Sequence, residues 1–460
     1  MIPLLRAVSD ALDGRADYYD VRVLNVTSTS LEMKKGAVTR AVAGKDAGAC
    51  VRVLCQGAWG LASTPDGSRE ALGDAAGRAF RIARGISETA AERAELAPVP
   101  PAKDDVTVPM RENFLDVPID EKLTLLSEVH GALKGYDFVT NDLITYRDTY
   151  TVEEFYSSEG SALVTRTPRV FWAIELVGRK DGQAQAVRRR IGATAGLEAF
   201  DDDAPLKRAD EAAASLVALL NGHAPPSGPM PVIADPELAG VFAHEAIGHA
   251  AEGDLVATGN SCFGGRLGER VASELVTVRD DATLPGGNGS LVYDDEGVRA
   301  GNKVLIEGGV LHDFIQSRET AAKLGMAPNG GARAESYHGR PLVRMSNTYV
   351  EPGDRTFREL LEGVALGVYA KGTRGGQVNT AQGFFTFNAQ ESYLIEHGEI
   401  TRPLRDVSLS GRTLDTLRLI DGVAKDEDRS GVGICGKGQW VPVGHGGPHL
   451  RIARCVVGGR

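Results

Sequence analysis

The sequence lacks long apolar runs and an excess of basic residues, and both absences narrow the classes of protein to which it can belong. A membrane-spanning helix needs about 18 consecutive apolar residues, and no such run occurs. Basic residues are the minority, with 51 Lys and Arg against 62 Asp and Glu, so the net charge is −11. Nucleic-acid binding needs a basic surface. We therefore expect neither a membrane-embedded protein nor a nucleic-acid partner.

Cysteine is also scarce, and the common nucleotide-binding motifs are absent. The chain has five cysteines in 460 residues, an odd number that does not suggest the disulfide framework of a small secreted domain. Its first residues contain an apolar stretch that is too short for a secretion signal. Neither a P-loop nor a glycine fingerprint opening a strand–helix unit occurs. The expected location is the cytoplasm.

Proline-rich stretches indicate how the chain is divided. AELAPVPPAKDDVTVP and HAPPSGPMPVIADP read as extended connectors. They predict three parts: an N-terminal α+β domain (1–95), a middle α+β segment (96–222) and a β-rich C-terminal domain (223–460). Glycine makes up 56 of the residues and is concentrated after residue 225, which indicates many turns there.

Hydrophobic periodicity predicts an α+β fold. Residues 2–13 favour a helix, and five short alternating runs between residues 18 and 64 favour an antiparallel meander, followed by a helix over 69–86. The middle segment repeats this plan: after a helix over 118–136, strands lead to a closing helix at 203–222. We therefore expect antiparallel sheet-plus-helix segments followed by a β-rich catalytic domain.

The stretch VFAHEAIGHAAEGD, residues 241–254, carries the candidate chemistry. Its two histidines, His244 and His249, are five residues apart, whereas the common zinc-peptidase motif H-E-x-x-H places them four apart. On a regular α-helix, residues five apart point away from each other, by about 140°. The histidines share a metal only if the helix contains a wider π-type turn or ends early. The spacing alone leaves two interpretations open: a metal site, or two ordinary histidines.

The sequence around this motif predicts the bounds of its helix. Asp235 is a good N-cap and Pro236 suits the first helical position. Gly253 is the expected stop. Gly248, next to His249, lowers the cost of a distorted last turn.

Several blocks in order resemble the TldD/PmbA (TldD/TldE) metalloprotease family. After HEAIGHAAEGD, they include ESYHGRPLVRMSNTYVEPGD, NTAQGFFTFNAQESYLIEHGEITRPLRDVSLSG and GVGICGKGQWVPVGHGGPHLRIARCVVGG. The resemblance covers roughly the second half of the chain, from about Ala234. The chain is similar to the TldD kind of subunit, which carries the histidine motif, and differs from the PmbA (TldE) kind, which lacks it.

This resemblance implies a zinc peptidase. It assigns zinc to His244, His249 and Cys435, with Glu245 as the catalytic acid/base. It further implies extended or unfolded peptides as substrates, and a homodimer or a heterodimer with a PmbA/TldE-like subunit. The alternatives are a non-catalytic peptide-binding partner subunit and a structural metal module in an interaction protein. Because His244, Glu245, His249 and Cys435 are all present, the sequence favours an active subunit over a non-catalytic partner subunit.

Other residues have weaker claims to a role. Glu252 and Asp254 follow His249 closely, and one of them is expected to orient a ligand imidazole. His338 is a candidate for lining the cleft, and His445 is expected at the surface. The run TAQGFFTFNAQES (380–392) is a candidate strand beside which an extended peptide binds as an added strand.

Overall fold

The computed structural model describes residues 3–12 and 14–459. The N-terminal half builds one seven-stranded sheet, in the order β3-β2-β1-β5-β6-β4 with β7 also pairing with β6. Its strands are β1 (Tyr18–Lys34), β2 (Ala37–Cys55), β3 (Ala58–Thr64), β4 (Lys103–Thr107), β5 (Val139–Ser157), β6 (Ala162–Lys180) and β7 (Gln183–Ala193). The helices are α1 (Pro3–Leu12), α2 (Arg69–Ser87), α3 (Ile119–Leu133) and α4 (Ala204–Leu220), with 3-10 turns η1 (Phe114–Asp116) and η2 (Leu197–Phe200). The ends of the predicted helix 2–13 lie outside the described residues.

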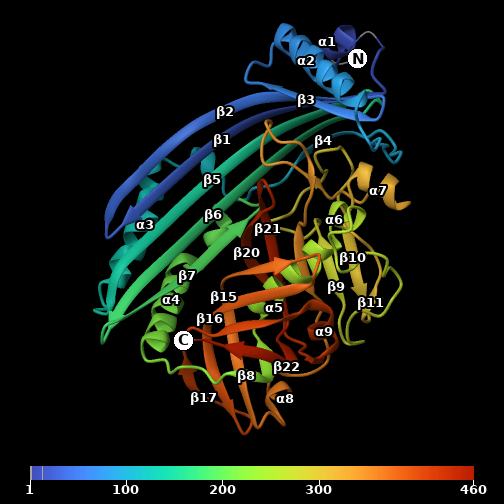
Figure 1. Cartoon of the computed structure of the whole chain (residues 1–460). Helices are drawn as coiled ribbons and strands as arrows, with labels where there is room; N and C mark the ends of the chain where they lie inside the picture. The colour runs from blue at the N-terminus through green and yellow to red at the C-terminus, as the bar shows by residue number, and fades with distance from the viewer. Residues whose placement is uncertain (1–2, 13, 460) are drawn as a thin grey trace.

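The two predicted meanders meet in the middle of this sheet. Strand β1 pairs antiparallel with β5, and each meander carries its own helix, α2 on β2 and β3 and α4 on β6 and β7. The shared plan of meander followed by helix therefore recurs as two sheet halves. The long strands curve together over one side of the molecule, and the C-terminal half lies on their concave side (Figure 1).

The sequence predicted five short runs between residues 18 and 64, but the structure has three strands there. Strand β1 has 17 residues and β2 has 19. The polar residues between the runs do not end the strands, because backbone pairing of β1 with β5, and of β2 with β1, continues past them. The first connector also contains a strand that periodicity did not indicate. This strand, β4, pairs in parallel with β6.

The C-terminal half contains two larger sheets and the two-stranded pair β12 (Ala332–Arg333) and β13 (Leu342–Val343). One sheet has the order β11-β10-β9-β14-β21-β20: β9 (Val278–Asp281), β10 (Asn302–Glu307), β11 (Val310–Leu311), β14 (Asn347–Val350), β20 (Asp428–Gly436) and β21 (Trp440–Gly447). The other contains β8 (Gly228–Ala234), β15 (Leu366–Asn379), β16 (Phe384–Glu396), β17 (Glu399–Leu404), β18 (Ser408–Arg412), β19 (Ile420–Val423) and β22 (Leu450–Gly458).

The largest hydrophobic core lies between these C-terminal sheets and the helix that carries the histidine motif. The helical segments here are α5 (Pro236–Phe242), the π turn η3 (Ala243–Gly248), the 3-10 turn η4 (His249–Ala251), α6 (Gly253–Ala257), α7 (Arg318–Leu324), α8 (Phe357–Leu361) and α9 (Thr413–Arg418). The architecture confirms the predicted α+β class. In the part of the chain that the structure describes, no helix is long and apolar enough to cross a membrane.

Candidate metal centre

The helix that carries the motif begins as the sequence predicts. The Oδ1 atom of Asp235 accepts a hydrogen bond from the backbone N–H of Leu238, at 2.8 Å, and Pro236 occupies the first helical position. Helix α5 then packs against β20 and β21. Its buried Phe242 packs edge-on against Phe385 of β16. The helix is thus held between the two C-terminal sheets, one of which supplies the sulfur of the centre.

The two histidines lie on a π turn, one of the two geometries that the five-residue spacing allowed. The backbone N–H of His249 donates to the carbonyl of His244, which is the i+5 to i bond of a π-helix. This wider turn brings the histidines onto one face, with ring centroids 5.1 Å apart. His249 also begins the 3-10 turn η4.

Two expectations about glycine in this segment are wrong. Gly253 does not end the helix, because η4 already ends at Ala251 and Gly253 opens the short helix α6. Gly248 has ordinary helical angles, φ −57° and ψ −52°. Its role is steric: a Cβ here would lie 2.0 Å from the sulfur of Met345. Glycine lets the π turn pack directly against this buried methionine.

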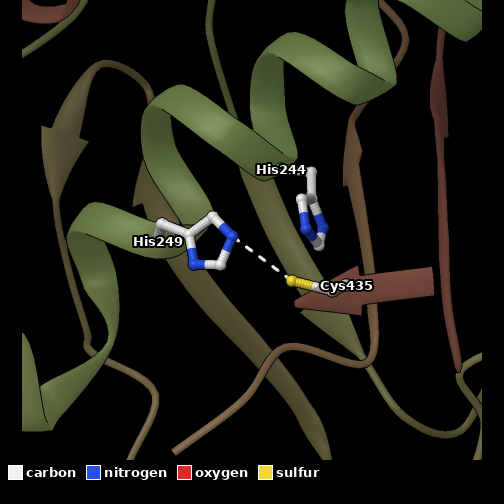
Figure 2. Close-up of side chains that lie close together, drawn as sticks. All are labelled: His244, His249 and Cys435. Carbon is white, nitrogen blue, oxygen red and sulfur yellow. Dashed lines mark hydrogen bonds between the residues drawn. The ribbon is translucent and has the colours of Figure 1, made fainter. Parts of the chain in front are cut away.

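Cys435, near the end of β20, completes a cluster with the two histidines. Its Sγ lies 3.3 Å from His249 Nε2. One ligand atom from each of His244, His249 and Cys435 lies within 4.8 Å of the others, and all three residues are buried. Figure 2 shows the thiol and both imidazoles converging from the helix and the strand. The structure thus brings together all three residues to which the resemblance assigned zinc.

The electrostatics of the cluster favour a thiolate. Burial by itself raises the pKa of Cys435, but hydrogen bonds and charge from His244 and His249 outweigh it and lower that pKa to about 4. Burial also opposes charge on His249, yet the carboxylate of Glu252 raises the pKa of this imidazole well above its ordinary value. A thiolate is the form of cysteine that binds metals.

A buried polar network holds His249 and the turn after Cys435 in place. Fully buried Glu252 has its Oε2 3.0 Å from His249 Nδ1. The ammonium of Lys437 donates to that same carboxylate at 3.0 Å and to the carbonyl of Val343 at 2.8 Å. Asp254 binds Lys437, at 2.9 Å, rather than an imidazole. Glu252 therefore contacts a histidine of the cluster, whereas Asp254 contacts Lys437 and the backbone N–H of Leu255.

A cavity of about 540 Å³ opens in front of the cluster. Glu245 lines it, and the Oε2 atom of Glu245 lies 3.8 Å from His249 Nε2. His445 lines the same cavity and is only 7% exposed, so its predicted surface position is wrong. His338 does not line the cavity; its Nδ1 lies 3.1 Å from Ser63 Oγ, at an exposed contact with β3.

Two residues of the site, Lys437 and Arg344, went unnoticed in the sequence. Lys437 stands two residues after Cys435, so proximity was a usable signal. Arg344 is fully buried and donates to the carbonyl of Cys435 at 2.6 Å. No local pattern marks it, because the contact joins residues 91 positions apart.

The donor set fits a zinc ion. Zinc–sulfur and zinc–nitrogen bonds of about 2.3 and 2.0–2.1 Å put neighbouring ligand atoms about 3.5 Å apart in a tetrahedron. The observed separation of Cys435 Sγ and His249 Nε2, 3.3 Å, is close to that value. His249 has the carboxylate partner on its second nitrogen that metal-binding histidines usually have. Two imidazoles and one thiolate leave a fourth position for another ligand.

Models of the known PmbA/TldA metallopeptidase domains match most of the chain. Domain 1 matches residues 19–83, the central domain 112–220 and the C-terminal domain 227–459. A protein from Methanothermobacter thermautotrophicus named Metalloprotease is 42% identical, over 97% of both chains. The chain belongs to the PmbA/TldD metallopeptidase family. The family resemblance of the sequence is thereby confirmed.

Two further comparisons, one of sequence and one of structure, accompany the family match. A Saccharolobus solfataricus protein named Zinc metalloprotease TldD homolog is 33% identical, over 90% of this chain and 91% of its own. The solved structure of TldE from Thermococcus kodakarensis superposes with a TM-score of 0.80, covering all of both chains at 18% identity. At that identity the structural likeness shows a shared fold only.

Proposed function

We propose that this chain is a zinc-dependent peptidase that hydrolyses unfolded or extended peptides. The observation that carries the proposal is the cluster of His244, His249 and Cys435, with Glu245 beside it on one cavity. Membership of a metallopeptidase family and the zinc-protease name of a 33% identical relative support it.

In this proposal the three buried residues hold the ion and Glu245 moves the proton. Zinc, when bound, polarises the scissile carbonyl and makes a water molecule easier to deprotonate. Glu245 takes a proton from the attacking water, whose oxygen adds to the carbonyl carbon. As the carbon–nitrogen bond breaks, Glu245 passes that proton to the leaving amine. Glu252 holds the His249 ring in orientation throughout.

The substrate is proposed to be an extended peptide that adds to an open strand edge. The run 380–392 does not provide that edge, because β16 pairs with β15 on one side and with β17 and β18 on the other. Strand β20 suits the role better. Its only strand partner among the described residues is β21, and it carries Cys435. Backbone hydrogen bonds along β20 would select an extended main chain over particular side chains.

The assembly is proposed to be a dimer, either of this chain with itself or with a PmbA/TldE-like chain. The basis is that a TldE chain has the same fold. The division of the chain at residues 95 and 222 likewise stays a proposal.

Substitution of Glu245 by glutamine tests the function. We expect Glu245→Gln to bind zinc as the wild type does and to lose hydrolysis of a quenched-fluorescent unstructured decapeptide by about 10²–10⁴-fold, because only the proton acceptor is removed. Zinc content and steady-state rates are measured on the zinc-loaded protein, alone and with a TldE-like chain. Glu399→Gln, at an exposed position in β17, is the matched control.

If the wild type holds zinc yet cleaves nothing in either assembly, the chain is a peptide-binding subunit or a structural metal module. Equal rates for the wild type and Glu245→Gln would remove Glu245 from the mechanism.

A further inference from the structure

His445 is a buried histidine beside the metal centre that does not belong to the metal cluster. It lies in β21 and pairs with Gly431 of β20. Directly paired residues in an antiparallel ladder share a face, and so do residues two apart along a strand. Cys435 pairs with Val441 four pairs further along β20 and β21, an even number that keeps the face the same. The imidazole of His445 and the thiol of Cys435 therefore emerge on the same face of the sheet, the face that meets α5.

Two glycines in β20 make room for the His445 ring. A Cβ at Gly431 would lie 2.5 Å from the ring carbon Cδ2, closer than real atoms approach. A Cβ at Gly433 would lie 3.6 Å from Nδ1. The ring thus lies across the backbone of β20 between Gly431 and Gly433, and Gly433 lines the cavity together with His445.

The two ring nitrogens of His445 are in different surroundings. Nε2 is buried and has no hydrogen-bond partner among the described residues. Nδ1 has no protein partner there either, but it is not among the fully buried atoms and so reaches the cavity. A buried N–H without an acceptor is rarer and costlier than a buried acceptor without a donor. The proton of the neutral ring therefore belongs on Nδ1, where it points to the cavity.

The surroundings also keep this ring neutral. Burial, together with the charge of Arg190, lowers the pKa of His445 to about 3. The histidine therefore offers one N–H donor at neutral pH.

We propose that His445 is a further catalytic residue, whose Nδ1–H binds the carbonyl oxygen of the scissile peptide bond as that oxygen gains negative charge. The inference rests on the proposed peptidase function. Gly433 and Cys435 are two residues apart in β20, a rise of about 6.8 Å. His445 and the three residues of the cluster line the same cavity, so a carbonyl oxygen about 3 Å from Nδ1 lies in the space that the cluster also faces. Donors placed where charge develops stabilise the transition state more than the bound substrate.

The test compares three variants of the zinc-loaded protein on the same decapeptide. His445→Phe keeps a ring but removes the donor, and we expect kcat to fall by about 10²–10³-fold. KM should stay within about threefold, because the lost bond acts in the transition state. A phosphinic analogue of the peptide, which imitates the tetrahedral carbon, should lose affinity in step with kcat/KM. His445→Gln, with an amide donor, should recover part of the rate.

The third variant leaves His445 itself unchanged. Gly433→Ala places a methyl group 3.6 Å from Nδ1, where it should crowd the approach to this nitrogen, and 3.1 Å from Cγ2 of Val443, which must move by a few tenths of an ångström. We expect this variant to fold and to lose kcat as His445→Phe does. His312→Phe, at an exposed position far from the cavity lining, is the control and should match the wild type.

The outcomes separate the inference from the function on which it rests. If the wild type cleaves the peptide and His445→Phe cleaves it equally fast, the proposed role of His445 is wrong and the proposed peptidase function stands. A fall in zinc affinity that parallels the fall in kcat makes His445 structural and also overturns the role. A wild type that cleaves no peptide overturns both.

Discussion

At the residue scale, the centre depends on more than its three metal-binding side chains. Lys437 joins the turn after Cys435 to the helix, because its ammonium binds Glu252 at 3.0 Å and the carbonyl of Val343 at 2.8 Å. Glu252 in turn binds His249. One lysine thus connects the sulfur side of the centre to the imidazole side.

We predict that Lys437→Met weakens zinc binding by about 10–100-fold, because the orienting carboxylate loses its cation and the Cys435 turn loses its anchor. Competition for zinc against a chromophoric chelator measures the dissociation constant. Lys323→Met removes a half-exposed lysine that pairs with Glu92 and should leave the constant unchanged. A value for Lys437→Met within about twofold of the wild type would show that the network is dispensable.

The sequence marked the ligands better than it marked their neighbours. His244, His249 and Cys435 stand in recognisable blocks, so a resemblance was enough to pair them across about 190 residues. His445 was misjudged because VGHGG resembles a turn. In the structure the glycines of this run lie in a strand, and the residues that make the His445 position special, Gly431 and Gly433, lie on the neighbouring strand. A single sequence does not show which strand that is.

At the element scale, the sequence could predict the π turn. It could not predict the steric reason for that turn. Two histidines five residues apart reach one ion only through an irregular turn, so the spacing alone limits the geometry. The close packing of Gly248 on Met345 depends on a residue 97 positions away, which no local pattern reveals. The long strands β1 and β2 were divided wrongly for a similar reason, since pairing with β5 continues β1, and pairing with β1 continues β2, through polar stretches.

Gly248→Ala should test whether the packing of the π turn holds the centre. We predict a loss of about 1–3 kcal/mol in the free energy of unfolding, because the added methyl displaces the fully buried Met345. Zinc affinity should fall as well, since His249 is the next residue. Urea unfolding of the zinc-free protein and zinc titration measure the two effects.

A glycine in an ordinary helix provides the comparison for Gly248→Ala. Gly85 lies in α2, and a Cβ there meets nothing within 4 Å. Gly85→Ala should therefore stabilise the protein by roughly 0.5–1 kcal/mol and leave zinc binding unchanged. If Gly248→Ala behaves in the same way, the steric account of the π turn is wrong.

At the scale of the whole molecule, the site is shared between the two halves of the chain. The cavity is lined by residues of the curved N-terminal sheet, such as Arg188 and Arg190 of β7, as well as by β20 and the histidine helix. The sequence predicted an N-terminal meander and a β-rich catalytic region but gave no indication that they form one cavity. That arrangement rests on contacts between distant segments, and it makes the N-terminal half part of the cavity wall.

Buried ion pairs outside the metal cluster also connect these halves. Arg22 of β1 is fully buried and binds Asp295, and Arg52 of β2 binds Glu296 at 3.1 Å. Arg22 also donates to the carbonyl of Gly339 at 2.8 Å. Burial and the charge of Asp295 raise the pKa of neighbouring Glu153 well above its ordinary value, which shows how closely acidic groups are placed here.

We predict that Arg22→Met destabilises the protein by about 3–5 kcal/mol, because it leaves Asp295 without its buried partner and removes the cation nearest to Glu153. Urea unfolding followed by fluorescence measures the change. Arg69→Met breaks a pair with Asp10 in which both side chains are about 60% exposed, so it should cost less than about 1 kcal/mol. If the two variants lose equal stability, the buried pairs do not hold the halves together, and the cavity must depend on apolar packing alone.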